Sequence, residues 1–257
     1  MFSSLASRLQ GEVNPLYRLR RELEARGREV IDLVSGNVTE HGIVYPQDLL
    51  ADILARASRR AAVYRPDSMG QRPAREAVAR YYESQGLPVS PDSVLLTPGT
   101  SISYWYCFKL LADPGDEVLC PSPSYPLFDY IASMSGVDMV PYPMLESRGW
   151  RIDLERLELM VSTRTRAVVL ISPHNPTGHV AGAAELDALA EIARRHGLAI
   201  ISDEVFSEFL FTVESLPRPA VLSAPLVITL NGFSKHSMSL VSVLSVWWPR
   251  ILRHLAG

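Results

Sequence analysis

The stretch "RAVVLISPHNPTGHVAGAAELDALAEIARRHGLAIISDEVF", residues 166–206, contains one complete strand–helix–strand unit. Its two apolar runs, "AVVLIS" and "LAIIS", show no alternation with polar residues, which is typical of strands buried on both faces. The segment between them, "AAELDALAEIARRHG", has apolar residues at helical spacing. A unit of this kind joins two parallel strands through a helix.

Similar units occur on both sides of this stretch. Further apolar runs occur in "SVLLTPG", "DEVLCPSPSY" and "PLVITLNGFSK", and the helical pattern "SISYWYCFKLLAD" follows the first of them. Repeated units predict an α/β fold of three layers, α/β/α, with a mainly parallel sheet. Towards the N-terminus the sequence predicts helices at residues 15–27, 48–62 and 71–85, and a short strand at residues 29–37.

Composition excludes several classes of function. The chain has 257 residues, is 47% hydrophobic and 21% charged, and carries a net charge of −3. This near-neutral balance gives no reason to expect nucleic acid or an anionic membrane as a partner. The longest apolar runs are far shorter than the roughly 18 residues of a membrane span. The start of the chain lacks the apolar core of a signal peptide.

The cysteines favour a reducing compartment. Cys107 and Cys120 are the only two in the chain, which makes neither a disulfide framework nor a metal-binding spacing. We therefore expect a cytoplasmic location and no metal site.

Polar residues follow the predicted strands at the points where ligands bind in parallel sheets. The segment Gly99-Thr100-Ser101 opens a helix, and its backbone N–H groups and hydroxyls suit an anion. Tyr125 could stack on a flat heterocycle. Asn175, in the turn "HNPTG", could donate to a ring hydroxylate.

Two charged residues complete the set. Asp203 ends a buried strand, where a carboxylate is costly unless it meets a cation such as a protonated pyridine nitrogen. Lys235, in "NGFSK", follows another buried strand, and a lysine amine can form a Schiff base with an aldehyde. Each residue also has an ordinary structural interpretation: a capped turn, core packing, an Asn-Pro turn, a salt bridge or an exposed lysine. Together they describe one ligand, pyridoxal 5′-phosphate.

At this point the sequence resembles the fold-type I pyridoxal-phosphate enzymes, specifically the class I/II aminotransferases, from about Val13 to Lys235. The resemblance implies that Lys235 forms the internal aldimine, that Asp203 meets the ring nitrogen and that Asn175 meets the ring hydroxyl. It also implies the roles of further residues: phosphate binding by Gly99, Thr100 and Ser101, ring stacking by Tyr125, contact with the neighbouring subunit's cofactor phosphate by Tyr64, and a place beside the substrate carboxylate for Gly36.

The implied activity is transfer of an amino group between an amino acid and a 2-oxo acid in a homodimer, with Lys235 as general base and acid. Two alternatives stay open. A lyase or decarboxylase can use the same cofactor site, and a catalytically inactive protein can retain it. The resemblance further implies two domains: residues 1–45 as the N-terminal segment of a small domain, and residues 46–257 as a C-terminally truncated large domain.

The sequence departs from the family pattern mildly at Gly232, where some members have a phosphate-binding serine, and more clearly in two other places. Phe206 stands where the family has a tyrosine that hydrogen-bonds the ring hydroxyl. After Lys235 the family's "PG-x-[RK]-x-G" pattern is absent, Val243 stands where its basic residue belongs, and the region with the arginine that binds the substrate α-carboxylate is missing. We hypothesise a frameshift just after Lys235, although "LVSVLSVWW" could still form a last strand.

Overall fold

The computed structural model describes residues 15–32, 38–125, 127–211, 213–219 and 224–236. The chain divides into two compact units, Met1–Val44 and Tyr45–Gly257. The smaller unit contains helix α2 (Pro15–Ala25) and the 3-10 helix η1 (Val38–His41). The predicted strand at residues 29–37 is not seen at residues 29–32, and its remaining residues lie outside the described ones.

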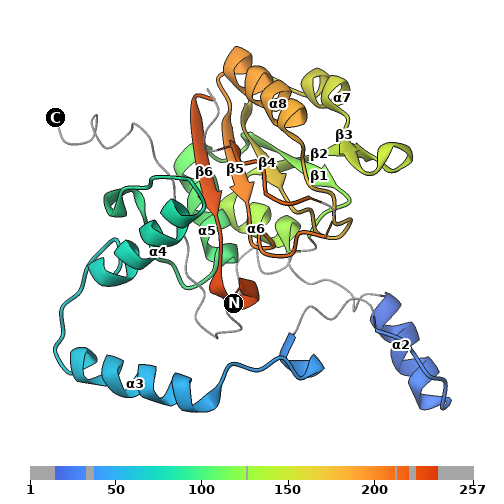
Figure 1. Ribbon diagram of the computed structural model, residues 1–257. Helices are drawn as coiled ribbons and strands as arrows, with labels where there is room; N and C mark the ends of the chain where they lie inside the picture. The colour runs from blue at the N-terminus through green and yellow to red at the C-terminus, as the bar shows by residue number, and fades with distance from the viewer. Residues whose placement is uncertain (1–14, 33–37, 126, 212, 220–223, 237–257) are drawn as a thin grey trace, which may run out of the picture. The chain divides into compact units, whose positions relative to one another are not determined.

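The larger unit is built on a six-stranded sheet, counted over the described residues, with strand order β3-β2-β1-β4-β5-β6. Figure 1 shows the strands side by side. Every neighbouring pair is parallel except β2 and β3. The mainly parallel α/β fold predicted from the sequence is therefore confirmed. The strands are β1 (Glu117–Ser122), β2 (Asp138–Leu145), β3 (Arg151–Ile152), β4 (Thr165–Ile171), β5 (Ala199–Asp203) and β6 (Leu226–Leu230).

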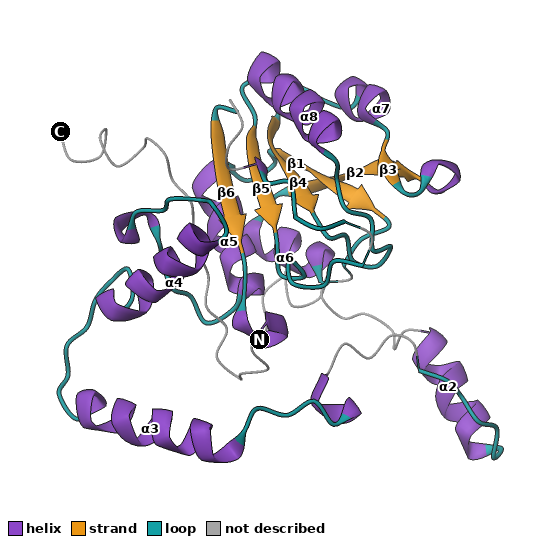
Figure 2. Cartoon of the chain, viewed as in Figure 1, coloured by secondary structure: helices purple, strands orange, loops and turns teal. Residues whose placement is uncertain are grey.

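Helices cover both faces of this sheet, which gives three layers (Figure 2). Helices α5 and α6 pack on one face, and α7 and α8 pack on the other. No helix in the described ranges combines the length and the apolar character that a membrane crossing requires. The helices of this unit are α3 (Gln47–Ala61), α4 (Arg72–Ser84), α5 (Thr100–Leu111), α6 (Phe128–Ser135), α7 (Leu154–Leu159), α8 (Ala183–His196) and α9 (Phe233–His236), with the 3-10 helices η2 (Pro91–Ser93) and η3 (Glu146–Arg148).

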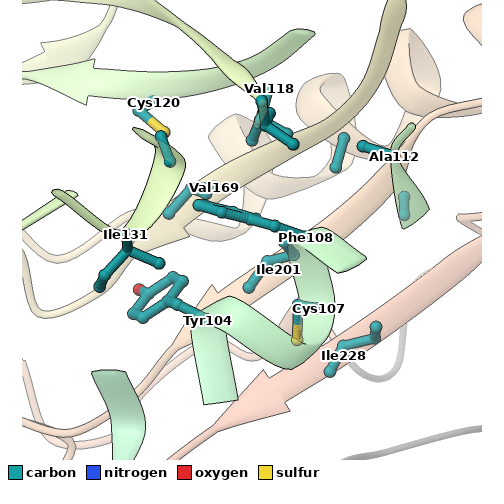
Figure 3. Packing of buried hydrophobic residues seen from close by; sticks show 14 of the residues in the cluster. Tyr104, Cys107, Phe108, Ala112, Val118, Cys120, Ile131, Val169, Ile201 and Ile228 are labelled. Carbon is teal, nitrogen blue, oxygen red and sulfur yellow. The ribbon is translucent and has the colours of Figure 1, made fainter. Parts of the chain in front are cut away.

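Alternate residues of the central strands enter the two cores, as the strand period of two requires. Ile201 of β5 faces the core of α5 and α6, whereas its neighbour Ile200 faces the core of α7 and α8. Figure 3 shows Phe108 of α5 packed with Val169 and Ile201 of the sheet. Since both faces are covered, the strands read as unbroken apolar runs in the sequence.

One predicted strand, "SVLLTPG" at residues 93–99, is wrong. Val94 has an extended backbone, but the segment from Val94 to Pro98 belongs to no strand of the sheet. The Leu96 N–H donates to the Met69 carbonyl at 3.0 Å, and the buried Val94 packs with Tyr82 of α4. A short apolar run buried against a helix therefore has the same sequence signature as a buried strand.

Strands β2 and β3 were not predicted, because β2 contains Pro141 and Pro143, which argue against a strand. The structure explains how the prolines are accommodated. The Pro143 carbonyl accepts from the Asp153 N–H at 3.1 Å, on the side away from β1. In a parallel pair the N–H and carbonyl of one residue face the same neighbour, so the N–H that Pro143 lacks is not needed for pairing with β1.

The core of α5 can be tested with two substitutions on this helix. Phe108 is fully buried, whereas Leu110 is 54% exposed. We expect Phe108→Ala to lower the free energy of unfolding by about 3–5 kcal/mol, because it leaves a cavity between α5 and the sheet. The control Leu110→Ala should change it by no more than about 0.5 kcal/mol. Urea denaturation measures both, and equal losses would contradict the packing described above.

Candidate cofactor site

The carboxyl ends of three adjacent strands bring predicted site residues to one edge of the sheet. Asp203, the last residue of β5, lies between Ile171 of β4 and Leu230 of β6 in the strand register. Asn175 follows Ile171 by four residues, and Lys235 follows Leu230 by five. The strand order β4-β5-β6 therefore makes these three segments start next to one another.

The Asp203 carboxylate is held by two neutral donors. The Tyr104 hydroxyl donates to Oδ2 at 2.7 Å, and the Val205 N–H donates to Oδ1 at 3.0 Å. Burial raises the pKa of Asp203, and these two hydrogen bonds oppose the shift. A desolvated carboxylate with neutral partners is a favourable place for a cation.

Helix α5 supplies one of these donors from near its N-terminus, because Tyr104 is four residues, about one helical turn, beyond Thr100, where the helix begins. Gly99 is the N-cap and, as a glycine, has no side chain that could cap the helix. The Gly99 carbonyl accepts from the Ser103 hydroxyl at 2.9 Å. Thr100 and Ser101 are half-buried in the first turn of α5. Backbone N–H groups and hydroxyls at a helix start are chemically suited to an anion.

Asn175 lies in a tight turn after β4. The Gly178 N–H donates to the His174 carbonyl at 2.7 Å, and the His174 N–H donates to the His179 carbonyl at 2.8 Å. The His174 ring is buried, with Nδ1 at 2.8 Å from the Thr177 hydroxyl. Asn175 itself is half-buried and precedes a cis peptide bond to Pro176. The turn is therefore held by its own backbone and by the buried histidine.

Tyr125 is close enough to Asp203 for the carboxylate charge to affect the pKa of its hydroxyl. Burial raises the pKa of the Tyr125 hydroxyl, and the Asp203 carboxylate raises it further. The Tyr125 ring packs edge-on against Phe128, with centroids 6.0 Å apart, and remains 38% exposed. An exposed aromatic face beside the carboxylate is compatible with stacking on a flat ligand.

The remaining residues predicted from the sequence lie in other segments of the chain. Lys235 is half-buried within the short helix α9, and Tyr64 is 89% exposed between α3 and α4. Gly36 lies outside the described residues, as does the chain after His236 with Val243 and the strand predicted there. Phe206 packs against Phe209, with ring centroids 6.1 Å apart.

Within the described part of the chain, no group of His, Cys, Asp or Glu is arranged to hold a metal ion.

Sequence reasoning missed two features of this edge. The sequence predicts Tyr104 only as part of an apolar helix, and nothing in "SISYWYCF" distinguishes it from a core aromatic. Glu204, next to Asp203, forms a buried ion pair with Arg218. Burial raises the pKa of Glu204 to about 7, and Arg218 opposes the shift. The only sequence signal for this pair is a second acid at the end of a buried strand.

The hydrogen bond from Tyr104 to Asp203 leads to a first test at this site. Tyr104→Phe removes a donor that stabilises the charged carboxylate, so we expect the pKa of Asp203 to rise further. Carbon-13 NMR titration of the aspartate carboxyls measures it. Tyr106→Phe, at an exposed position on the same helix, should leave it unchanged. An unchanged Asp203 titration in Tyr104→Phe would contradict the assigned hydrogen bond.

The buried His174 leads to a pH-dependent test. Burial, with a smaller contribution from His179, lowers its pKa from 6.5 to about 4. The unfolded chain therefore binds a proton at higher pH than the folded one, so stability is lost as pH falls through this window. Between about pH 7.5 and pH 5 this group should cost the wild type about 2 kcal/mol. His174→Leu should lose that much less over the same range in urea titrations, and parallel pH curves would contradict the assignment.

The sequence as a whole matches a known family. The family described as aminotransferase class I and II matches residues 28–241. Glutamate-pyruvate aminotransferase AlaA of Haemophilus influenzae is 33% identical over 223 residues, which are 86% of this chain and 55% of that protein. Alanine aminotransferase of Mycobacterium tuberculosis strain H37Rv is 35% identical over 224 residues, again 86% of this chain and 52% of the relative. The chain thus spans about half the length of these curated relatives.

Solved structures agree with the sequence matches. An aminotransferase from Escherichia coli superimposes with a TM-score of 0.82 and 29% identity, over 99% of this chain and 64% of that one. Alanine aminotransferase from Pyrococcus furiosus gives a TM-score of 0.84 and 27% identity, over 96% of this chain and 63% of that one. The chain therefore belongs to the class I and II aminotransferases, on the fold-type I architecture.

Proposed function

We propose that the protein is a pyridoxal-phosphate-dependent aminotransferase that transfers an amino group between an amino acid and a 2-oxo acid. The observation that carries the proposal is the Asp203 carboxylate, which is desolvated at the sheet edge and held by two neutral donors. A protonated ring nitrogen would supply the missing positive charge. A fixed carboxylate would in turn keep that nitrogen protonated.

The residues around Asp203 fit the remaining groups of this cofactor. The uncapped start of α5, with Gly99, Thr100 and Ser101, would hold the phosphate. Tyr125 would stack on the ring, and the Asn175 amide would donate to its hydroxyl. These assignments combine the family resemblance with the positions described above.

Lys235 is the proposed catalytic residue. Pyridoxal phosphate supplies an aldehyde that joins to amines and a ring that accepts the electron pair released at the substrate Cα. Lys235 Nζ would bind the aldehyde carbon covalently, with the aldehyde oxygen leaving as water. Once the substrate amine displaces it, the free Lys235 amine would accept a proton and return it as general base and acid. Its place five residues beyond β6 is compatible with reach to the edge where Asp203 lies.

Alanine is the amino acid we propose to assay first. Relatives more than 30% identical are named alanine aminotransferase and glutamate-pyruvate aminotransferase.

We further propose that residues 1–45 belong to a small domain, with Gly36 beside the substrate carboxylate, and that residues 46–257 form the large domain. In a homodimer the exposed Tyr64 would reach the cofactor phosphate of the partner subunit. The free, buried Cys107 and Cys120 suit the cytoplasm.

The chain offers a clean test of covalent cofactor binding, because it contains only two lysines, Lys109 and Lys235. We expect incubation with pyridoxal phosphate, followed by borohydride reduction, to add one pyridoxyl group at Lys235. Lys109 is exposed in the last turn of α5, where its Nζ donates to the Ser135 carbonyl at 2.8 Å. It lies at the opposite end of the helix from Thr100 and Ser101, so one equivalent of pyridoxal phosphate should leave it unmodified. Peptide mass spectrometry identifies the modified lysine.

Two variants and one product assay complete this test. Lys109→Arg should be modified like the wild type, whereas Lys235→Arg should not be modified at all. Modification of Lys109, or of neither lysine, would contradict the proposal. Pyruvate release on adding L-alanine distinguishes an aminotransferase from a protein that binds the cofactor without turnover.

A further inference from the structure

Four buried residues next to the ends of β5 and β6 have no role in the function proposed above. They are Tyr82 of α4, Glu204, Arg218 and Asn231, and we call them the edge cluster. Each is at most 9% exposed. Glu204 directly follows Asp203, and Asn231 precedes Lys235 by four residues. The edge cluster therefore lies beside both proposed functional residues along the chain.

The first half of the edge cluster fixes the end of β5. The Arg218 guanidinium pairs with the Glu204 carboxylate, and both side chains are buried, with exposures of 8% and 1%. The Glu204 N–H donates to the Leu230 carbonyl at 2.8 Å, just past the last paired residues of β5 and β6. The residue after Asp203 is thus held through both its backbone and its side chain.

The second half fixes the turn that leads to Lys235. The carbon at the centre of the Arg218 guanidinium lies 5.4 Å from the centroid of the Tyr82 ring. The Tyr82 hydroxyl accepts from Asn231 Nδ2 at 3.3 Å, and Asn231 Oδ1 accepts from the Gly232 N–H at 2.7 Å. One continuous path of contacts therefore runs from Glu204 to the residue before α9.

Stability alone is a weak reason for such an arrangement. Removing two charges from water is costly, and replacing a buried ion pair with apolar side chains of similar size is often neutral or stabilising. A planar guanidinium, paired at its edge and stacked on its face, does fix geometry well. The edge cluster is better suited to setting positions than to adding free energy of folding.

We propose that the edge cluster is a positioning device that sets the place of Lys235 relative to Asp203 by tying the end of β5 to the turn before α9. This inference rests on the proposed function, since it assumes that Asp203 and Lys235 act on one cofactor. Its residues act through the backbone on either side.

The test replaces the ion pair with unbranched apolar side chains, in the double variant Glu204→Met/Arg218→Met. We expect its thermal unfolding midpoint to equal or exceed that of the wild type. The rate of borohydride-trapped pyridoxyl attachment at Lys235 should fall about tenfold or more, because small misplacements of reacting groups are costly. A purely structural role predicts the reverse: lower stability, with attachment unchanged in whatever protein remains folded.

A second variant covers the case in which the double variant does not fold. Tyr82→Phe keeps the ring beneath Arg218 but removes the oxygen that accepts from Asn231. It too should slow attachment at Lys235, and Tyr106→Phe on α5 should not. Wild-type attachment rates in the folded variants would overturn the positioning role alone. Absence of attachment in the wild type would instead overturn the proposed function.

Discussion

The parallel register of β4, β5 and β6 is the constraint on which the rest of the site depends. It places Ile171, Asp203 and Leu230 side by side, so the segments that follow these strands begin at the same edge of the sheet. Parallel strands that are buried on both faces carry little chemistry themselves, because their side chains fill the two cores. The chemistry is therefore concentrated in the residues immediately after the strands.

Desolvation gives this edge its electrostatic character. Asp203 and Glu204 are consecutive acids at the end of a buried strand, and burial raises the pKa of both carboxyls. The protein balances them differently. Glu204 has an internal cation in Arg218, whereas Asp203 has the Tyr104 hydroxyl and a backbone N–H. An acid with an internal cation suits a structural or positioning role, and one with neutral donors suits a charged ligand.

Sequence reasoning succeeded where local pattern and tertiary role agree. The strands ending near Asn175, Asp203 and Lys235 were predicted, because burial on both faces leaves an apolar run and a polar end. It failed where partners are distant in sequence. Arg218 sits in a loop 14 residues after Glu204, and Tyr104 is 99 residues from Asp203, so neither pairing leaves a local signal. The run at Val94 resembles a strand in sequence because its apolar residues pack in the core beside α4, where Val94 is buried and Leu96 is half-buried.

The central claim is that Asp203 holds a protonated pyridine nitrogen at the carboxyl edge of this sheet. Nitrogen-15 NMR of ring-labelled pyridoxal phosphate, bound to the protein at about pH 8, tests it most directly. We expect the shift of a protonated ring nitrogen in the wild type and of a neutral one in Asp203→Asn. A neutral nitrogen in the wild type, with the same shift in Asp203→Asn, would contradict the claim.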